Sequence, residues 1–106
     1  MNPQFNKGIL ELCVLALVSR KERYGYELVE LISSRIDISE GTIYPILKRL
    51  TEEDYFETYL QESKEGPPRK YYRITAKGRR VCHDGMRDWQ VFIRQVDTLL
   101  KEGEGK

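Results

Sequence analysis

The sequence predicts a mainly helical α+β fold with one small, two-stranded β element. Three observations predict it. Residues 39–50 have the spacing of a short amphipathic helix, residues 55–74 hold two β-prone runs around a Gly-Pro-Pro turn, and residues 76–101 form one long amphipathic helix. A chain of 106 residues has room for one small domain. Together these features predict a winged helix-turn-helix that is followed by a long C-terminal dimerisation helix.

The first helix is expected from Asn6 to Ser19 and is apolar nearly all round. Such a helix must be covered on more than one side. Because a chain of this length has few elements for the task, a second subunit is the expected cover. After the polar turn at residues 21–23, a second helix is expected from Tyr24 to about Ser34.

The third helix carries one apolar stripe and one unusual outer face. The stripe has the i, i+3, i+4, i+7 spacing of a helix packed on a core, at Ile43, Ile46, Leu47 and Leu50. Ser39 is expected to cap this helix through its side chain. Pro45 breaks a rule of helix interiors, so the helix either runs through it at a cost or starts later or kinks. Small, hydroxyl-bearing and cationic groups suit a helix that enters a DNA groove, and here the outer face holds Gly41, Thr42, Tyr44, Pro45 and Lys48.

Charge is unevenly distributed along a chain whose net charge is only +1. Residues 64–80 hold seven basic side chains and one acidic one, whereas residues 52–62 hold five acidic side chains and no basic one. The basic block surrounds the hairpin that is predicted from strands 55–62 and 70–74. A solvated surface is the simpler interpretation of such a run. Next to a predicted recognition helix, the basic block favours contact with DNA phosphates.

Thr75 is expected to cap the fourth helix, which continues to about Lys101. At ~1.5 Å per residue this helix is ~40 Å long, more than one small domain needs. A second copy of the chain is therefore expected to cover its stripe. The expected division is residues 5–75 for DNA binding, 76–101 for dimerisation and 102–106 for a disordered tail. The apolar residues of the helix follow steps of three or four, at Val81, Gly85, Trp89, Phe92, Ile93, Val96, Leu99 and Leu100.

The side-chain inventory argues against an enzyme, a metalloprotein and a membrane protein. His83 is the one histidine, nothing brings Ser39 near it, and no glycine-rich loop follows a strand. Cys13 and Cys82 lack zinc spacing, so two reduced thiols in the core or an interface are expected. No apolar run could span a bilayer, and the start lacks the order of a signal peptide. We expect a cytoplasmic protein without metal or cofactor.

Five motifs in order resemble the PadR family of bacterial transcriptional regulators, in its short subfamily with one C-terminal helix. The motifs are residues 7–11, 24–28, 39–45, 66–72 and 75–78. The resemblance implies a homodimeric repressor that binds a palindromic operator at its own promoter or beside a transporter or detoxification gene. It also implies that a small planar aromatic effector stacks on Trp89, although a single tryptophan on such a stripe more often packs in an interface. The alternative function is a winged-helix module that binds protein and not specific DNA sequences.

Residue roles follow from the same resemblance. Base contacts are expected from Thr42, Tyr44 and Lys48, although Tyr44 could instead be a structural residue. The full DNA-binding set is Tyr24, Tyr26, Ser39, Thr42, Tyr44, Pro45, Lys48, Lys64, Arg69, Lys70 and Tyr71. The expected dimer interface is Ile9, Cys13, Cys82, Trp89, Phe92, Ile93, Val96, Leu99 and Leu100.

Overall fold

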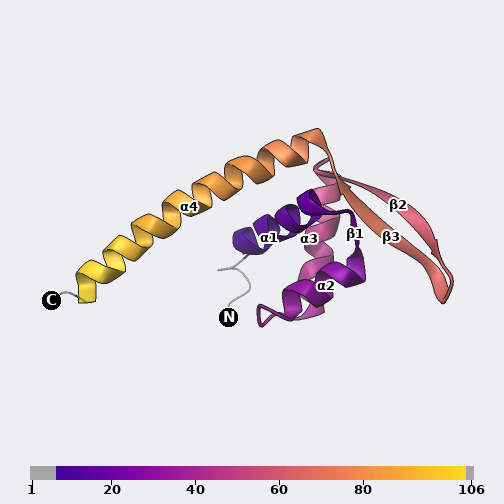
Figure 1. Cartoon of the computed structure of the whole chain (residues 1–106), viewed down its shortest axis with the longest axis horizontal. Helices are drawn as coiled ribbons and strands as arrows, with labels where there is room; N and C mark the ends of the chain where they lie inside the picture. The colour runs from indigo at the N-terminus through magenta and orange to yellow at the C-terminus, as the bar shows by residue number, and fades with distance from the viewer. Residues whose placement is uncertain (1–6, 105–106) are drawn as a thin grey trace.

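The computed structural model describes residues 7–104, which fold into four helices and one three-stranded sheet (Figure 1). The mainly helical α+β class is confirmed. The β hairpin projects at one end of the molecule and the last helix extends to the other, giving extents of 60 × 28 × 20 Å. The elements are α1 (Lys7–Arg20), β1 (Arg23–Tyr24), α2 (Gly25–Ser33), α3 (Glu40–Glu52), β2 (Phe56–Ser63), β3 (Gly66–Ile74) and α4 (Ala76–Glu104).

The sheet contains a strand that the sequence does not reveal. Strand β1 pairs antiparallel with β3, at Arg23 with Tyr72 and Tyr24 with Tyr71, which gives the order β1-β3-β2. The prediction that Tyr24 opens the second helix was therefore wrong: it precedes α2 in an extended conformation. A strand of two residues is too short to show the alternation by which strands are recognised.

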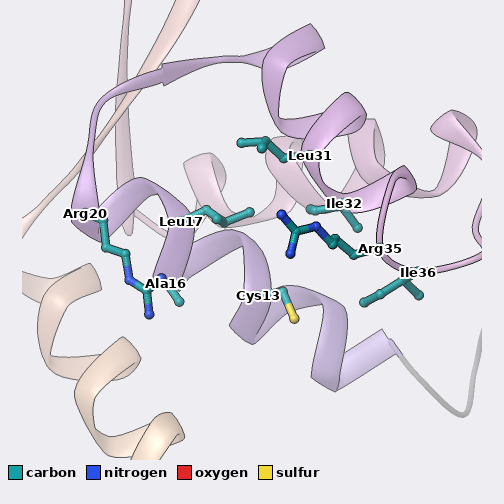
Figure 2. A pocket seen from close by; sticks show the side chains of 8 residues that line it. All are labelled: Cys13, Ala16, Leu17, Arg20, Leu31, Ile32, Arg35 and Ile36. Atoms are coloured by element: carbon teal, nitrogen blue, oxygen red, sulfur yellow. The ribbon is translucent and has the colours of Figure 1, made fainter.

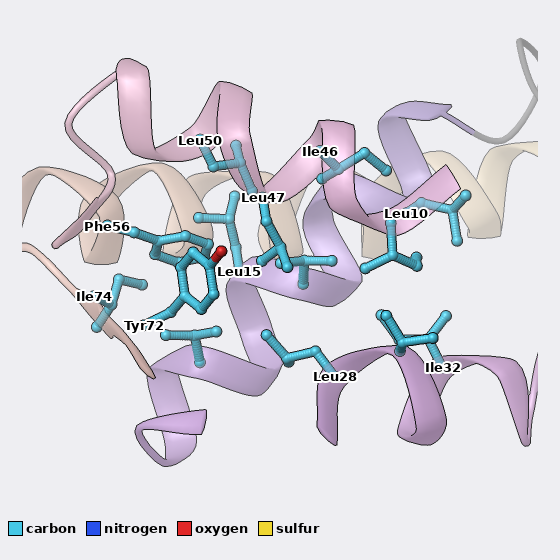
Figure 3. Close-up of a cluster of buried hydrophobic side chains, with 14 of the residues drawn as sticks. Leu10, Leu15, Leu28, Ile32, Ile46, Leu47, Leu50, Phe56, Tyr72 and Ile74 are labelled. Carbon is cyan, nitrogen blue, oxygen red and sulfur yellow. The ribbon is translucent and has the colours of Figure 1, made fainter. Parts of the chain in front are cut away.

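The hydrophobic core lies where α1, α2 and α3 meet the base of the sheet (Figure 3). The predicted stripe of α3 is confirmed, because Ile43, Ile46, Leu47 and Leu50 are all buried. Cys82 of α4 is also buried in this core. Its assignment to the dimer interface was wrong, because the first turns of α4 face their own domain. The other core residues are Leu10, Val14, Leu15, Val18, Leu28, Val29, Ile32, Phe56, Tyr72 and Ile74.

Helix α3 continues through Pro45 from Glu40 to Glu52, so the alternative of a later start was wrong. Ser39 occupies the N-cap position with an extended backbone but makes no side-chain capping bond. Instead, its hydroxyl oxygen lies 3.3 Å from that of Thr42. The expected side-chain cap was wrong, because a neighbouring hydroxyl competes for the Ser39 side chain.

The return strand is longer than expected, and the tip of the hairpin lies at Lys64 and Glu65. Ser63 pairs with Gly66, after an irregularity that begins at Gln61. Pro67 and Pro68 therefore lie in β3, not in the turn. Strand β1 pairs only with residues 71–72, so one edge of β3 is unpaired beside these prolines, which lack a backbone donor.

Helix α4 spans 29 residues and is ~43 Å long at ~1.5 Å per residue. The predicted cap is confirmed, because the backbone N–H of Gly78 donates to Oγ1 of Thr75 over 3.0 Å. The helix includes residues 102–104, which were assigned to the disordered tail; residues 105–106 lie outside the described part, as do residues 5–6 of the first predicted domain. Across residues 7–104, no helix combines the length and the apolarity needed to cross a bilayer.

Candidate nucleic-acid interface

The outer face of α3 is open to solvent. Gly41, Tyr44, Pro45 and Lys48 are exposed, and Thr42 is half-buried. Arg49 does not belong to this face, because its Nε donates to Oε1 of Glu11 on α1 over 2.8 Å and its second nitrogen lies 2.5 Å from Oε2. The hydrogen bond with Glu11 raises the pKa of the Arg49 guanidinium above its ordinary value. Lys48 is therefore the cation that α3 presents outward.

Tyr44 is both packed and exposed. Its side chain rests against Gly25 at the start of α2, where an added Cβ would lie only 3.3 Å from Cε1 of the tyrosine. Even so, 45% of Tyr44 is exposed. The structure therefore allows Tyr44 both a structural role and a contact with a partner. One side of its ring packs against Gly25, and the other side remains open to solvent. A larger residue at Gly25 would push the ring outward.

A hollow of about 650 Å³ separates the hairpin from α2 and α3. Five of the predicted DNA-binding residues line it, namely Tyr24, Tyr26, Tyr44, Arg69 and Lys70. Tyr26 is exposed, and a hydrogen bond with the Glu30 carboxylate raises the pKa of its phenol. The rest of the predicted set lies outside the hollow: Ser39 just before α3, Thr42, Pro45 and Lys48 on α3, Lys64 at the hairpin tip, and Tyr71.

Tyr71 belongs to an aromatic row that crosses the sheet. Tyr24, Tyr71 and Tyr59 are in register on β1, β3 and β2, and each adjacent pair of rings has centroids 5.5 Å apart. The Arg69 guanidinium lies 4.6 Å from the Tyr24 ring centroid, and that of Arg73 lies 5.3 Å from Tyr59. We call these three tyrosines the tyrosine ladder. Tyr59 was missing from the predicted set. A regular count back from the turn places it opposite Lys70, and the irregularity between Gln61 and Ser63 shifts it to Tyr71.

The basic block divides into two groups. Arg73 pairs with Glu57 over 3.1 Å, Lys77 donates to the carbonyl of Glu53 over 3.0 Å, and Arg79 donates to the carbonyl of Ser19 over 3.3 Å. These three side chains have partners within the fold. Among the described residues, the block's other four cations form no ion pair, namely Lys64, Arg69 and Lys70 on the hairpin and Arg80 on α4.

The predicted dimer residues fall on α1 and on the outer half of α4. Phe92, Leu99 and Leu100 are 56%, 67% and 65% exposed, although they form part of an apolar stripe. Ile93 is exposed as well, and Val96 and Trp89 are half-buried. Ile9 and Cys13 are half-buried on α1. A continuous apolar stripe of this extent is unusual on the water-exposed surface of a monomeric protein.

Two hollows flank α1. One, of about 370 Å³, lies between α1 and α2 and is lined by Cys13, Ala16 and Leu17 together with Arg20 and Arg35 (Figure 2). Burial raises the pKa of the Cys13 thiol. The other, of about 350 Å³, lies between α1 and α4. It is lined by Gly8, Ile9, Glu11, Leu12, Leu15, Val81, Gly85, Asp88, Trp89 and Phe92.

Comparison with known proteins gives a consistent result. Residues 14–84 match the model of the transcriptional regulator PadR-like family. The crystal structure of a PadR-like transcriptional regulator from Bacillus cereus is 41% identical, has a TM-score of 0.80, and is aligned over 92% of this chain and 96% of that one. A Streptococcus transcriptional regulator is 36% identical with a TM-score of 0.81, over 91% and 96% of the two chains.

A further relative is the negative transcriptional regulator PadR of Bacillus subtilis, which is 29% identical over 100 residues. The alignment covers 89% of this chain and 52% of that protein, so this chain spans about half the length of that relative.

Proposed function

Because the chain belongs to the PadR-like family of transcriptional regulators, and is thus a DNA-binding regulator and not an enzyme, we propose that it is a homodimeric repressor. Its site of action is double-stranded DNA in the cytoplasm, at a palindromic operator. The regulated genes are its own and a neighbouring transporter or detoxification gene. Repression is supported by the name of the Bacillus subtilis relative, a negative regulator. The residue roles are proposed from the arrangement of the described side chains.

One observation carries the DNA-binding surface: Tyr44 on the exposed face of α3 and two unpaired cations of the hairpin, Arg69 and Lys70, line the same hollow. In this proposal α3 enters the major groove, where Lys48 reaches guanine and Thr42 or Tyr44 contacts a thymine methyl. The hairpin lies on the sugar-phosphate backbone, to which Arg69 and Lys70 donate. Two α3 helices related by a two-fold axis then meet successive major grooves ~34 Å apart.

The experiment compares Lys48→Ala with Lys70→Ala on a selected operator and on a random duplex at several salt concentrations. Lys70→Ala should weaken both duplexes alike. Because a dimer loses two phosphate contacts, the slope of log K against log salt should fall by ~1.8. Lys48→Ala should weaken the operator by about tenfold or more and leave the random duplex almost unchanged.

Lys101→Ala serves as the matched control, because Lys101 is an exposed cation on the last turns of α4, whose partner is Asp97 at 2.9 Å. It should change neither affinity nor slope. Equal losses on both duplexes from Lys48→Ala would contradict its base-reading role. If selection yields no preferred duplex at all, the alternative of a protein-binding winged helix is favoured.

The homodimer is supported by the exposed stripe of α4 and by the half-buried apolar residues on both flanks of α1. Leu99→Asp places a charge on the stripe, so sedimentation should show a monomer at concentrations where the natural chain is a dimer. Thr98 is exposed and lies on the opposite face of the helix by its spacing. Thr98→Asp is therefore the matched control and should stay dimeric. A dimer that survives Leu99→Asp unchanged would exclude the stripe as its interface.

The effector site that we propose is the hollow between α1 and α4. Trp89 and Phe92 lie on its α4 side with ring centroids 6.4 Å apart, and the carboxylates of Glu11 and Asp88 are on its lining. Aromatic rings beside carboxylates suit a planar aromatic ligand, above all a cationic one. Glu11 also forms an ion pair with Arg49 of α3. A ligand that contacts Glu11 would therefore be linked through Arg49 to α3, the helix that is proposed to enter the major groove.

Trp89 fluorescence reports on this site directly. Cationic, neutral and anionic planar dyes should quench it in that order of affinity, and the cationic dye should weaken operator binding. Trp89→Leu should remove the effect of the dye on DNA binding without changing DNA binding in its absence. Unchanged emission and unchanged operator affinity across the three dyes would exclude an effector at Trp89.

A further inference from the structure

The C-terminal end of α3 is closed by an unusual residue. Asp54 has a positive φ of 64°, a left-handed conformation that glycine adopts most readily. Its N–H donates to the carbonyl of Thr51, and the N–H of Tyr55 donates to the carbonyl of Leu50, both over 3.0 Å. These two hydrogen bonds end the helix. The carbonyls of the next three residues, 53–55, lie beyond it.

The start of α4 supplies donors to all three of these carbonyls. Thr75 donates its backbone N–H to the carbonyl of Tyr55 over 2.9 Å. Its hydroxyl oxygen lies 2.7 Å from the carbonyl oxygen of Asp54 and 3.1 Å from that of Tyr55. Lys77 donates to the carbonyl of Glu53 over 3.0 Å. The Thr75 hydroxyl, the Thr75 backbone N–H and the Lys77 ammonium group thus join the end of α3 to the start of α4.

At this junction, Gly78 allows the first turn of α4 to lie directly against the backbone that follows α3. A Cβ at residue 78 would overlap the carbonyl oxygen of Tyr55 and lie 2.8 Å from Cγ1 of Ile74. The N–H of Gly78 donates to the hydroxyl oxygen of Thr75, so the same oxygen also caps α4. Because the Thr75 hydroxyl both donates to the end of α3 and accepts from Gly78 of α4, it constrains the rotation of α4 as well as its distance.

The geometry points to Thr75 as a positioning residue that sets the separation of the two reading helices, and so the spacing of operator half-sites. This inference rests on the proposed homodimer. In that dimer, α3 is connected to the partner through the junction and the ~43 Å lever of α4. A tilt of ~5° at the base of such a helix moves its far end by ~3.5 Å, about the rise of one base pair.

The test uses Thr75→Val, which keeps the shape of the side chain and loses the hydroxyl. Operators selected with the natural protein are rebuilt with half-sites one or two base pairs closer or farther apart, and each variant is titrated against this set. Thr75→Val should bind the original spacing roughly tenfold more weakly, and its preference among spacings should flatten or shift. Thr75→Ser, which keeps the hydroxyl, should retain the natural profile.

Val14→Ala is the matched control, because it weakens the buried core on α1 and leaves the junction intact. It should lower the unfolding temperature without moving the spacing preference. If Thr75→Val fails to fold, Lys77→Met removes the neighbouring donor and should shift the profile in the same direction. A natural protein without any preferred spacing would overturn the homodimer together with this inference. A spacing preference that survives both junction variants would overturn this inference alone.

Discussion

Replacing Pro45 by alanine should stabilise the protein and impair its reading of DNA. Pro45 is the sixth residue of α3 and interrupts no core contact, because it is exposed. A proline in a helix interior costs ~3 kcal/mol relative to alanine, through a lost N–H and crowding of the carbonyl four residues earlier. Here that carbonyl belongs to Gly41, also exposed, so water can satisfy it and reduce the loss.

The expected gain follows from these terms. Water at Gly41 lowers the cost, and proline also restricts the unfolded chain, which offsets ~0.4–1 kcal/mol. Pro45→Ala should therefore raise the free energy of unfolding by ~1–2 kcal/mol, or the midpoint temperature by ~5–10 °C. Urea and thermal unfolding at one fixed protomer concentration measure this, since the stability of the proposed dimer would depend on concentration.

The same variant should bind the selected operator more weakly, because Pro45 lies on the exposed face of α3 that is proposed to enter the groove. Binding to a random duplex should change little. Lys48→Ala is the stability control, since it removes an exposed side chain of the same helix and should change the free energy of unfolding by less than ~0.5 kcal/mol. An unfolding midpoint that stays equal or falls in Pro45→Ala would refute the claim that this proline strains α3.

Three further predictions concern single contacts. Asp54→Gly should raise stability by ~0.5–1 kcal/mol in urea titrations, because glycine adopts the left-handed φ without a steric penalty; a loss would mean that the Asp54 side chain has a role of its own. Glu11→Gln should cost ~1 kcal/mol by breaking a two-point pair with Arg49, whereas the same change in the exposed pair of Glu57 should cost less than ~0.5 kcal/mol. Since burial raises the pKa of Cys13, its alkylation should be slower than that of a free thiol at neutral pH and accelerate as pH rises past 9; equal rates at pH 7.5 would contradict this.

The sequence predicted the helices and the exposed face of α3 because burial repeats with the period of the helix. Ile43, Ile46, Leu47 and Leu50 are all buried as expected, and the hairpin follows from its β-prone residues. Two features had no local signal. Strand β1 is too short to show a period, and Arg49 finds its partner Glu11 38 residues away. Pairing between residues so far apart depends on how α1 and α3 pack against each other. The spacing of residues along the sequence does not predict that packing.

Cys82 shows a different reason for error. The apolar stripe of α4 is continuous in the sequence, so all of it was assigned to one interface. In the structure its first turns, with Val81 and Cys82, pack against the domain, and its later turns, with Leu99 and Leu100, are exposed. A periodic pattern reports that a face is covered but not by what. The point at which the stripe stops packing on its own domain and becomes exposed depends on how far the domain extends along α4.

The tyrosine ladder has a consequence for how fast the protein captures DNA. A two-stranded hairpin alone is marginally stable in water, but here β1 and a row of cross-strand aromatic pairs hold its base, with Arg69 resting on Tyr24. The base of the hairpin and the Arg69 side chain are therefore ordered before the proposed contact with phosphate, which lowers the entropy cost of that contact. We expect encounters with DNA to be limited by diffusion and charge and not by ordering of the hairpin. Substitutions in the ladder should then slow association more than they speed dissociation.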